Sequence, residues 1–316
     1  MHDPTLSFAD IREAATRIAP HVLHTPVLRC AHLEKTLGAE IFFKCENLQE
    51  MGAFKIRGAS NAICCLADDV AINGVATHSS GNHGTAVALA AGRRGITACV
   101  VMPENASAFK KRAVAGYGAK IIYCEPTMAG RERALAKYLA ESGATEVHPY
   151  NDLAVMAGQG TAALELHAEA PDLQTILTPV GGGGLLSGTA VATRALRPAC
   201  RIVGAEPLGA DDAWRSLKAG HIEVLEHPDT ICDGLRATIG ALPFAIISEQ
   251  VDDIVRVSDV TTVNAMRYIW EHLKIIVEPS SAVVVAALRE GLVRVQGMRV
   301  GVILTGGNVD LDHLPW

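Results

Sequence analysis

Short apolar segments alternate with longer amphipathic segments along most of the chain. The apolar segments predict strands at residues 40–45, 74–78, 98–102, 120–124, 175–180, 201–205 and 300–304. Apolar residues at helical spacing follow most of them, as at residues 85–91, 132–139, 161–168 and 189–195. Strands that alternate with helices indicate an α/β fold, with parallel sheets covered by helices on both faces. Ser7 is the expected N-cap of a first helix.

The length of 316 residues allows two domains, or one large α/β domain with an inserted lobe. Hydrophobic residues make up 49% of the chain, which fits strands buried on both faces. No Pro/Ser-rich linker or long internal repeat divides the sequence. We therefore expect two closely joined lobes, with the chain crossing between them more than once.

Charge and composition argue against several classes of protein. The net charge of −6 and the aromatic content of 4% disfavour a nucleic-acid partner. No apolar window reaches the roughly 18 residues of a membrane span, and the first residues lack the features of a signal peptide. The eight cysteines include no Cys-x-x-Cys pair and lie mostly in apolar segments, as buried reduced thiols do. We expect a cytoplasmic protein with no membrane partner.

Four consecutive glycines, Gly181 to Gly184, follow the strand predicted at residues 175–180 and precede a helical segment. Without side chains, their backbone N–H groups can turn toward one anion, and the helix behind them adds its positive end. The segment lacks the Gly-Lys-Ser/Thr of a nucleotide triphosphate loop, so a single phosphate group fits best. A flexible turn is the alternative, which the entropy cost of ordering four glycines disfavours.

Two other predicted strands end in polar or glycine-rich segments, at residues 77–84 and 304–308. Ligands of open α/β sheets bind at the carboxyl ends of strands. Each segment alone could be a helix cap or a turn. Together with the glycine run, they indicate one crevice at which three strands end.

Lys55 follows a glycine turn and lies between the apolar residues Phe54 and Ile56. An isolated lysine is usually a solvated surface group. Apolar neighbours would instead desolvate the amine, lower its pKa and make it a nucleophile. A nucleophilic lysine together with a monophosphate site suggests pyridoxal phosphate, held by the lysine as a Schiff base.

Six segments carry a resemblance to a known family: FKCENLQ (43–49), GAFKIRGA (52–59), SSGNHG (79–84), PVGGGGL (179–185), EPS (278–280) and GGNVD (306–310). The chain resembles the fold-type II pyridoxal-phosphate enzymes of the serine/threonine dehydratase and serine racemase family. Ala53 and Thr85 differ from the residues most common there, and neither position has an assigned chemical role. The resemblance implies a tryptophan synthase β-like fold with two parallel-sheet lobes and the cofactor in the cleft between them. Residues 1–74 and 150–316 would form the large domain, and residues 75–149 the small one.

The resemblance also assigns roles to individual residues. Lys55 would bind the cofactor and move the α-proton of the substrate, and Ser80 would face it across the cofactor, which permits racemisation without requiring it. Thr305 would meet the pyridine nitrogen with a neutral hydroxyl, which weakens the electron sink and favours loss of a β-substituent. The expected cofactor-binding residues are Phe54, Lys55, Asn82, Gly181, Gly182, Gly183, Gly184, Leu185 and Thr305. The expected substrate-binding residues are Ser79, Ser80, Gly81, Asn82 and Arg131.

A divalent cation site is expected at Glu206, the carbonyl of Ala210 and Asp212. Oxygen ligands of this kind suit Mg²⁺, Ca²⁺ or Mn²⁺. The spacing alone is typical of a solvated helix start, and the resemblance to eukaryotic-type serine racemases is what favours the metal. The ion would be structural and activating, away from the chemistry.

The preferred function is that of an ammonia-lyase that removes water from a 3-hydroxy amino acid. Residues 45–50, 277–282 and 308–316 resemble bacterial hydroxyaspartate dehydratases, so we expect 3-hydroxyaspartate to give oxaloacetate and ammonia. Arg131 is the candidate partner for the β-carboxylate, with an exposed helix arginine as the alternative. Serine/threonine dehydratase and serine racemase remain alternative activities, and the family implies a homodimer.

Two other classes fit less well. A dinucleotide oxidoreductase would place an acidic residue about 20 positions after the glycines, where Glu206 lies, but it would leave Lys55 unexplained. A non-catalytic cofactor-binding protein would have no need for Lys55, Asn82 and Thr305 together.

Overall fold

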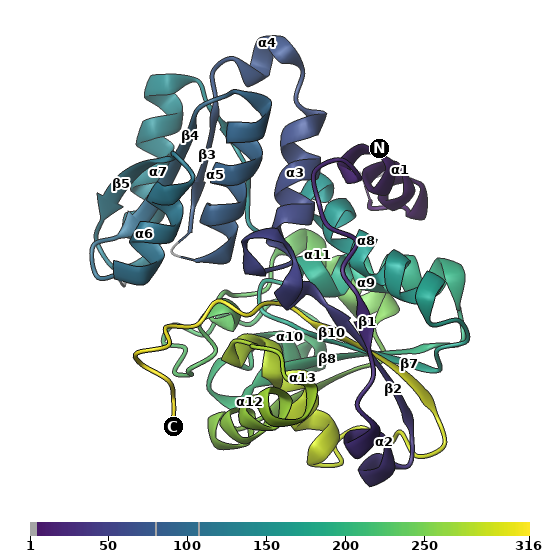
Figure 1. Ribbon diagram of the computed structural model, residues 1–316. Coiled ribbons are helices and arrows are strands. Elements are labelled where there is room, and N and C mark those ends of the chain that lie inside the picture. The colour runs from purple at the N-terminus through teal and green to yellow at the C-terminus, as the bar shows by residue number, and fades with distance from the viewer. Residues whose placement is uncertain (1–4, 80, 107) are drawn as a thin grey trace.

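Two separate sheets form the framework of the computed structural model, which describes residues 5–79, 81–106 and 108–316 (Figure 1). The strands of the larger sheet are, in spatial order, β1 (Val27–Leu28), β2 (Glu40–Cys45), β10 (Arg299–Leu304), β7 (Thr175–Pro179), β8 (Arg201–Pro207) and β9 (Asp253–Val257). Those of the smaller sheet are β5 (Lys120–Cys124), β4 (Ala98–Pro103), β3 (Val75–His78) and β6 (Thr145–Glu146).

Helices lie before and between these strands along the chain. They are α1 (Phe8–Ile18), α2 (Ala31–Leu37), α3 (Lys55–Cys65), α4 (Asp68–Ala71), α5 (Asn82–Arg94), α6 (Ala108–Gly116), α7 (Met128–Ser142), α8 (Leu153–Glu169), α9 (Gly184–Leu196), α10 (Asp212–Ala219), α11 (Ala241–Gln250), α12 (Asp259–Leu273) and α13 (Pro279–Arg289). Four 3₁₀ turns add to them: η1 (Glu46–Leu48), η2 (Glu50–Gly52), η3 (Leu208–Ala210) and η4 (Asp233–Leu235). Within the described ranges, none of the helices is long and apolar enough to cross a membrane.

The predicted α/β class and its parallel sheets are confirmed. All seven predicted strands are present, and Ser7 caps α1 in a capping box with Asp10. Strands β1, β6 and β9 were not predicted, and β1 pairs with β2 in the antiparallel direction, whereas the other pairs are parallel. The strands of the smaller sheet lie between residues 75 and 146, and the division at residues 74/75 and 149/150 stays a prediction.

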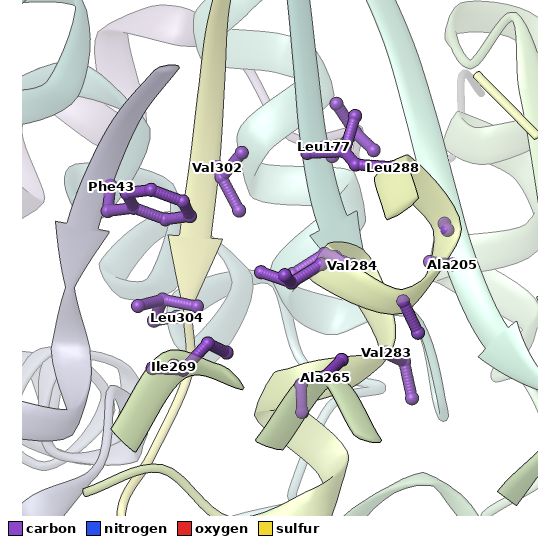
Figure 2. Close-up of a cluster of buried hydrophobic side chains, with 14 of the residues drawn as sticks. Phe43, Leu177, Ala205, Ala265, Ile269, Val283, Val284, Leu288, Val302 and Leu304 are labelled. Atoms are coloured by element: carbon purple, nitrogen blue, oxygen red, sulfur yellow. The ribbon is translucent and has the colours of Figure 1, made fainter. Parts of the chain in front are cut away.

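Helices cover both faces of the larger sheet. On one face, Val283, Val284 and Leu288 of α13 pack beside Leu177 of β7 and Val302 of β10 (Figure 2). On the other face, α1, α8, α9 and α11 bury a second apolar cluster against the same strands. Strands buried on both faces need apolar side chains at successive positions, which is why they are visible in the sequence as continuous apolar runs.

Helix α3 joins the two lobes because it packs against α5 of the smaller lobe and α8 of the larger one. A buried ion network holds it in place. The guanidinium of Arg57 pairs with two carboxylates. Its Nε and Nη2 donate to Glu46 at 2.8 Å, and its Nη1 donates to Glu165 at 2.6 Å. Lys44 on β2 pairs with the same Glu165 at 2.7 Å. The network therefore ties β2 and α8 to the helix whose first residue is Lys55.

All eight cysteines are free thiols. Six of them are buried, as expected, but Cys64 is half-buried and Cys65 is exposed at the end of α3. The apolar run that suggested burial there belongs to an amphipathic helix whose last turn reaches the surface.

Candidate active site

A cleft of about 540 Å³ is lined by residues from both lobes. The three segments that follow β3, β7 and β10 all reach it, as expected from the carboxyl ends of parallel strands. The sequence-predicted residues that line it are Phe54, Lys55, Ser79, Gly81, Asn82, Arg131, Gly181, Gly182, Gly183, Gly184, Leu185 and Thr305.

A tight turn before α3 places Lys55 in this cleft. Met51 and Gly52 both have left-handed backbones, with φ of 60° and 75°. A side chain at Gly52 would come within 2.5 Å of the amide oxygen of Asn308, so glycine is required there. The chain then runs beside the segment after β10, where the N–H of Phe54 donates to the carbonyl of Thr305 at 3.0 Å. The backbones at Lys55 and Thr305 are thereby held close together.

The amine of Lys55 is in an environment that favours its neutral form. Its Nζ donates to the carbonyl of Pro149 at 2.8 Å and lies 5.0 Å from the ring centre of Phe54. Burial lowers the pKa of Lys55 to about 8, against the opposing effect of the Glu278 charge. The unprotonated fraction of the amine near neutral pH is therefore a minority, but it is much larger than for an exposed lysine, and this form can act as a nucleophile or a base.

The glycine run forms a cradle at the start of α9. Gly183 is the N-cap, with a left-handed φ of 92°, and the helix begins at Gly184. A side chain at Gly182 would lie 2.3 Å from the ring of Tyr150, and one at Gly181 would lie 2.9 Å from the backbone of Leu235. The N–H groups of the first helical turn have no partner within the helix, so they can bind an anion. The shape and the donors of this cradle fit the phosphate of pyridoxal phosphate.

Asn82, the first residue of α5, belongs to a polar chain across the cleft. Its amide nitrogen donates to both carboxyl oxygens of Glu278, at 2.9 and 3.1 Å, and its amide oxygen accepts from Asn308 at 2.8 Å. Burial and the nearby Asp233 raise the pKa of Glu278. Sequence reasoning assigned no role to Glu278, although the segment EPS that contains it was among the matching motifs.

The described residues between β3 and α5 also line the cleft. Ser79 and Gly81 line the cleft, and the N–H of Gly81 donates to the hydroxyl of Ser79 at 3.2 Å. Ser80, predicted as the residue opposite Lys55, lies outside the described residues. The N-terminus of α5 adds positive charge to this side of the cleft, which suits a carboxylate.

Histidines that sequence reasoning did not assign also lie here. His83 lines the cleft, its Nε2 bonds to the carbonyl of Val147 at 2.9 Å, and its Nδ1 is buried without a described partner. Burial keeps the pKa of His83 well below its usual value, so the ring is neutral. Because the carbonyl takes the Nε2 proton, Nδ1 presents a free lone pair.

His78, Glu146 and His148 form a separate cluster, in which one possible metal-ligand atom of each residue lies within 4.8 Å of the others. The Nδ1 of His148 accepts hydrogen bonds from the N–H groups of Tyr150 and Asn151, at 3.3 and 2.9 Å. The proton of the neutral ring is then on Nε2, which leaves that nitrogen without a lone pair for a metal.

Arg131 extends from the first turn of α7 into the cleft. Its side chain is half-buried, and its Nε is buried without a hydrogen-bond partner in the described part of the chain. An exposed helix arginine, the alternative considered from the sequence, would have its guanidinium in solvent. The position instead offers a positive group to a ligand.

The predicted cation site lies away from the cleft lining, where β8 ends and α10 begins. Glu206 and Asp212 are both buried, at 0% and 2% exposure. Glu206 accepts the N–H of Trp214 with one oxygen, while its other oxygen has no described partner. Burial raises the pKa of both carboxyl groups, that of Asp212 to about 6. Two buried acids, one with an orphaned oxygen, fit a hard cation that would compensate their charge.

Comparison with known proteins identifies the family. The model of the pyridoxal-phosphate dependent enzymes matches residues 18–306. The chain belongs to this family. It is 48% identical over 316 residues to a β-hydroxyaspartate dehydratase of Paracoccus denitrificans, covering 100% of both chains. A serine racemase of Oryza sativa subsp. indica is 47% identical, with 99% of this chain and 94% of the relative covered.

Solved structures agree with this assignment. The structure of maize serine racemase superposes with a TM-score of 0.96 at 44% identity, covering 98% of this chain and 95% of the other. The resemblance inferred from the sequence motifs, the fold type and the dependence on pyridoxal phosphate are thereby confirmed. The protein is a pyridoxal-phosphate dependent enzyme with the fold of the serine racemases and threonine deaminases.

Proposed function

We propose that this enzyme is an ammonia-lyase that converts 3-hydroxyaspartate into oxaloacetate and ammonia. The observation that carries the proposal is the guanidinium of Arg131, which lies in the same cleft as Lys55 and the glycine cradle and whose Nε is buried without a hydrogen-bond partner among the described residues. A positive group there is suited to a substrate with a second carboxylate. The full-length similarity to a β-hydroxyaspartate dehydratase supports the same substrate.

The residues of the cleft divide the chemistry among them. Pyridoxal phosphate, when bound, supplies the electron sink for the negative charge that develops at Cα. The Gly181–Leu185 segment would hold its phosphate, and Asn82 and Thr305 would hydrogen-bond its ring. Lys55 would remove the α-proton, for which its lowered pKa is suited. Hydroxide leaves Cβ and takes up a proton to form water, and hydrolysis of the elimination product then consumes one water and releases ammonia.

The α-carboxylate of the substrate would bind at the N-terminus of α5. Ser79, Gly81 and Asn82 surround this position, and the resemblance adds Ser80. Helix N-termini attract anions and supply unpaired N–H donors, so a carboxylate needs no lysine or arginine there. Arg131 is therefore left for the β-carboxylate.

Racemisation is the second candidate activity. The 47% identity to a serine racemase is nearly as high as that to the dehydratase. Racemisation requires a proton donor on the face opposite Lys55, a role that the resemblance gives to Ser80. Serine or threonine dehydration would use the same residues without a β-carboxylate partner.

Kinetics with a substrate panel test the proposal. We expect wild-type kcat/KM to be higher for L-3-hydroxyaspartate than for L-serine or L-threonine. Arg131→Ala should lower the value for hydroxyaspartate by about 30- to 900-fold, which corresponds to roughly 2–4 kcal/mol of lost transition-state binding, and change the value for serine little. Arg133→Ala is the matched control, because Arg133 lies on the same helix and pairs with Glu125 at the surface.

Equal losses of kcat/KM for both substrates in the Arg131 variant would show that Arg131 does not bind the β-carboxylate. A wild-type preference for serine or threonine would overturn the substrate assignment. Formation of D-serine from L-serine at a rate above elimination would favour the racemase instead.

We also propose that Glu206, the carbonyl of Ala210 and Asp212 bind Mg²⁺, or Ca²⁺ or Mn²⁺ in its place. Chelation is expected to lower the melting temperature by several degrees and added Mg²⁺ to restore it, because a ligand that binds only the folded state stabilises it. Asp212→Ala should remove this response, whereas Glu226→Ala, at an exposed carboxylate, should keep it. Identical responses of wild type and Asp212→Ala would contradict the site.

The remaining proposals concern organisation. We propose that residues 1–74 and 150–316 form the cofactor-binding domain, that residues 75–149 form a separate small domain, and that the enzyme is a cytoplasmic homodimer. Light scattering on the purified holoenzyme tests the oligomeric state.

A further inference from the structure

A second arginine, Arg236, lines the cleft from the larger lobe, directly after η4. Its side chain is exposed, and exposed arginines are ordinarily free to change rotamer. This one is fixed. Its Nε donates to the carbonyl of Thr230 at 3.0 Å, and its Nη2 donates to the same oxygen.

The carbonyl that holds Arg236 is itself firmly placed. Thr230 is 3% exposed, and its hydroxyl donates to Asp259 at 2.6 Å. The N–H of Ile231 donates to the other oxygen of Asp259 at 2.9 Å. The guanidinium is therefore preorganised through a buried anchor, which reduces the entropy lost when it binds a ligand.

The donors that remain free on Arg236 suit an anion. A guanidinium has five N–H donors, and the contacts with Thr230 use two of them. In the described part of the chain, neither Arg236 nor Arg131 forms an ion pair with a carboxylate. In contrast, Lys110 of α6, which also lines the cleft, pairs with Asp233. Each lobe thus presents one guanidinium to the cleft that has no acidic partner among the residues the structure describes.

We propose that Arg236 is a second arginine that binds the β-carboxylate of the substrate, and that it comes from the lobe opposite to that of Arg131. This inference rests on the proposed function, and it deepens it by making the enzyme selective for short dicarboxylic amino acids. The α-carboxylate belongs at the N-terminus of α5 and the phosphate at the glycine cradle, so the β-carboxylate is the anion that remains for the two arginines. Two guanidinium groups on one carboxylate add geometric specificity as well as charge.

The phosphate of the cofactor would be the other anionic ligand group in the cleft. The backbone of Leu235 approaches the cradle closely, since a side chain at Gly181 would come within 2.9 Å of it. Binding of the phosphate by Arg236 would affect every substrate equally, whereas binding of the β-carboxylate affects dicarboxylates alone. The two sources are therefore separable by experiment.

The test compares Arg236→Gln with wild type and with the surface control Arg133→Gln, all as holoenzymes with unchanged circular dichroism. We expect Arg236→Gln to lower kcat/KM for 3-hydroxyaspartate by about 10- to 100-fold and to raise the inhibition constant of succinate by a similar factor. The kcat/KM for serine and the inhibition constant of propionate should change by less than about 3-fold. Arg236→Lys should recover only part of the lost kcat/KM, because lysine keeps the positive charge but cannot donate two parallel hydrogen bonds to one carboxylate.

The affinity of the apoenzyme for pyridoxal phosphate completes the test. It should change by less than about 2-fold in Arg236→Gln, because the inference assigns the free donors of Arg236 to the substrate and not to the phosphate. A tenfold weaker affinity with unchanged substrate selectivity would assign Arg236 to the phosphate and overturn the inference, as would equal losses for hydroxyaspartate and serine. If wild type itself fails to turn over hydroxyaspartate, the proposed function falls. The comparison of succinate with propionate would then still decide whether Arg236 reads a second carboxylate.

Discussion

Lys55→Ala is expected to abolish the visible absorption of lysine-bound pyridoxal phosphate and to lower kcat by about 10³-fold or more. Removal of a positioned proton-transfer group alone costs about 10²- to 10⁴-fold, and this variant also loses the covalent attachment. The fold should survive, because the side chain of Lys55 makes one hydrogen bond within the described ranges, to Pro149, and lies outside the buried ion network. Absorption spectra and single-turnover kinetics on the same preparation measure both effects.

Two variants make this result specific. Lys55→Arg keeps the positive charge but cannot form the imine, so it should lose the absorption as the alanine variant does. Lys137→Ala, at an exposed lysine of α7 that pairs with Glu141, should change neither property. An alanine variant at position 55 that kept both the absorption and full turnover would rule out the assigned role of Lys55.

The local features of the site could be predicted from the sequence because each is encoded in a few neighbouring residues. Lys55 follows its own glycine turn, and the cradle is a run of four glycines after a strand. Glu278 could not be assigned in this way. It meets Asn82 across 196 positions of sequence, and only the folded chain brings the carboxylate and the amide together.

The strands that sequence reasoning missed share one property, which is their place in the sheets. Strands β1 and β9 are the two edges of the larger sheet, and β6 is an edge of the smaller one. Edge strands are less covered than central ones, so they need no continuous apolar run. Strand β9 has Asp253 and Arg256 among its five residues, and β1 and β6 span two residues each, which is too few to show a period. The central strands are buried on both faces and were predicted to within a few residues.

The ion network around Arg57 was also hidden in the sequence, because its partners come from β2, η1 and α8. Lys44 and Glu46 flank an apolar position at the end of β2 and would be assigned to a solvated face by pattern alone. Both are 0% exposed in the structure, as is Arg57. Three buried charges are tolerated there only because each has a partner of opposite sign.

Arg57→Met is therefore expected to lower the free energy of unfolding by about 3–5 kcal/mol. The methionine fills part of the space, but it leaves Glu46 buried without its guanidinium and deprives Glu165 of its arginine partner. Arg197→Met, at a surface pair with Asp172, is the matched control and should cost less than about 1 kcal/mol. Urea unfolding followed by circular dichroism measures both variants, and a loss below about 1 kcal/mol for Arg57→Met would contradict the role of the network.

The double variant Glu46→Gln with Arg57→Met separates the charge from the packing. Removing both charges of a buried pair avoids the uncompensated carboxylate, so this variant should be more stable than Arg57→Met alone. The affinity for pyridoxal phosphate measures whether Lys55 keeps its position in these variants, because Lys55 lies two residues before Arg57 at the start of the same helix. If the network fixes that helix, Arg57→Met should weaken binding of pyridoxal phosphate to the folded apoenzyme, and the double variant should restore stability more fully than cofactor affinity. Recovery of both properties in parallel would mean that the network serves stability alone.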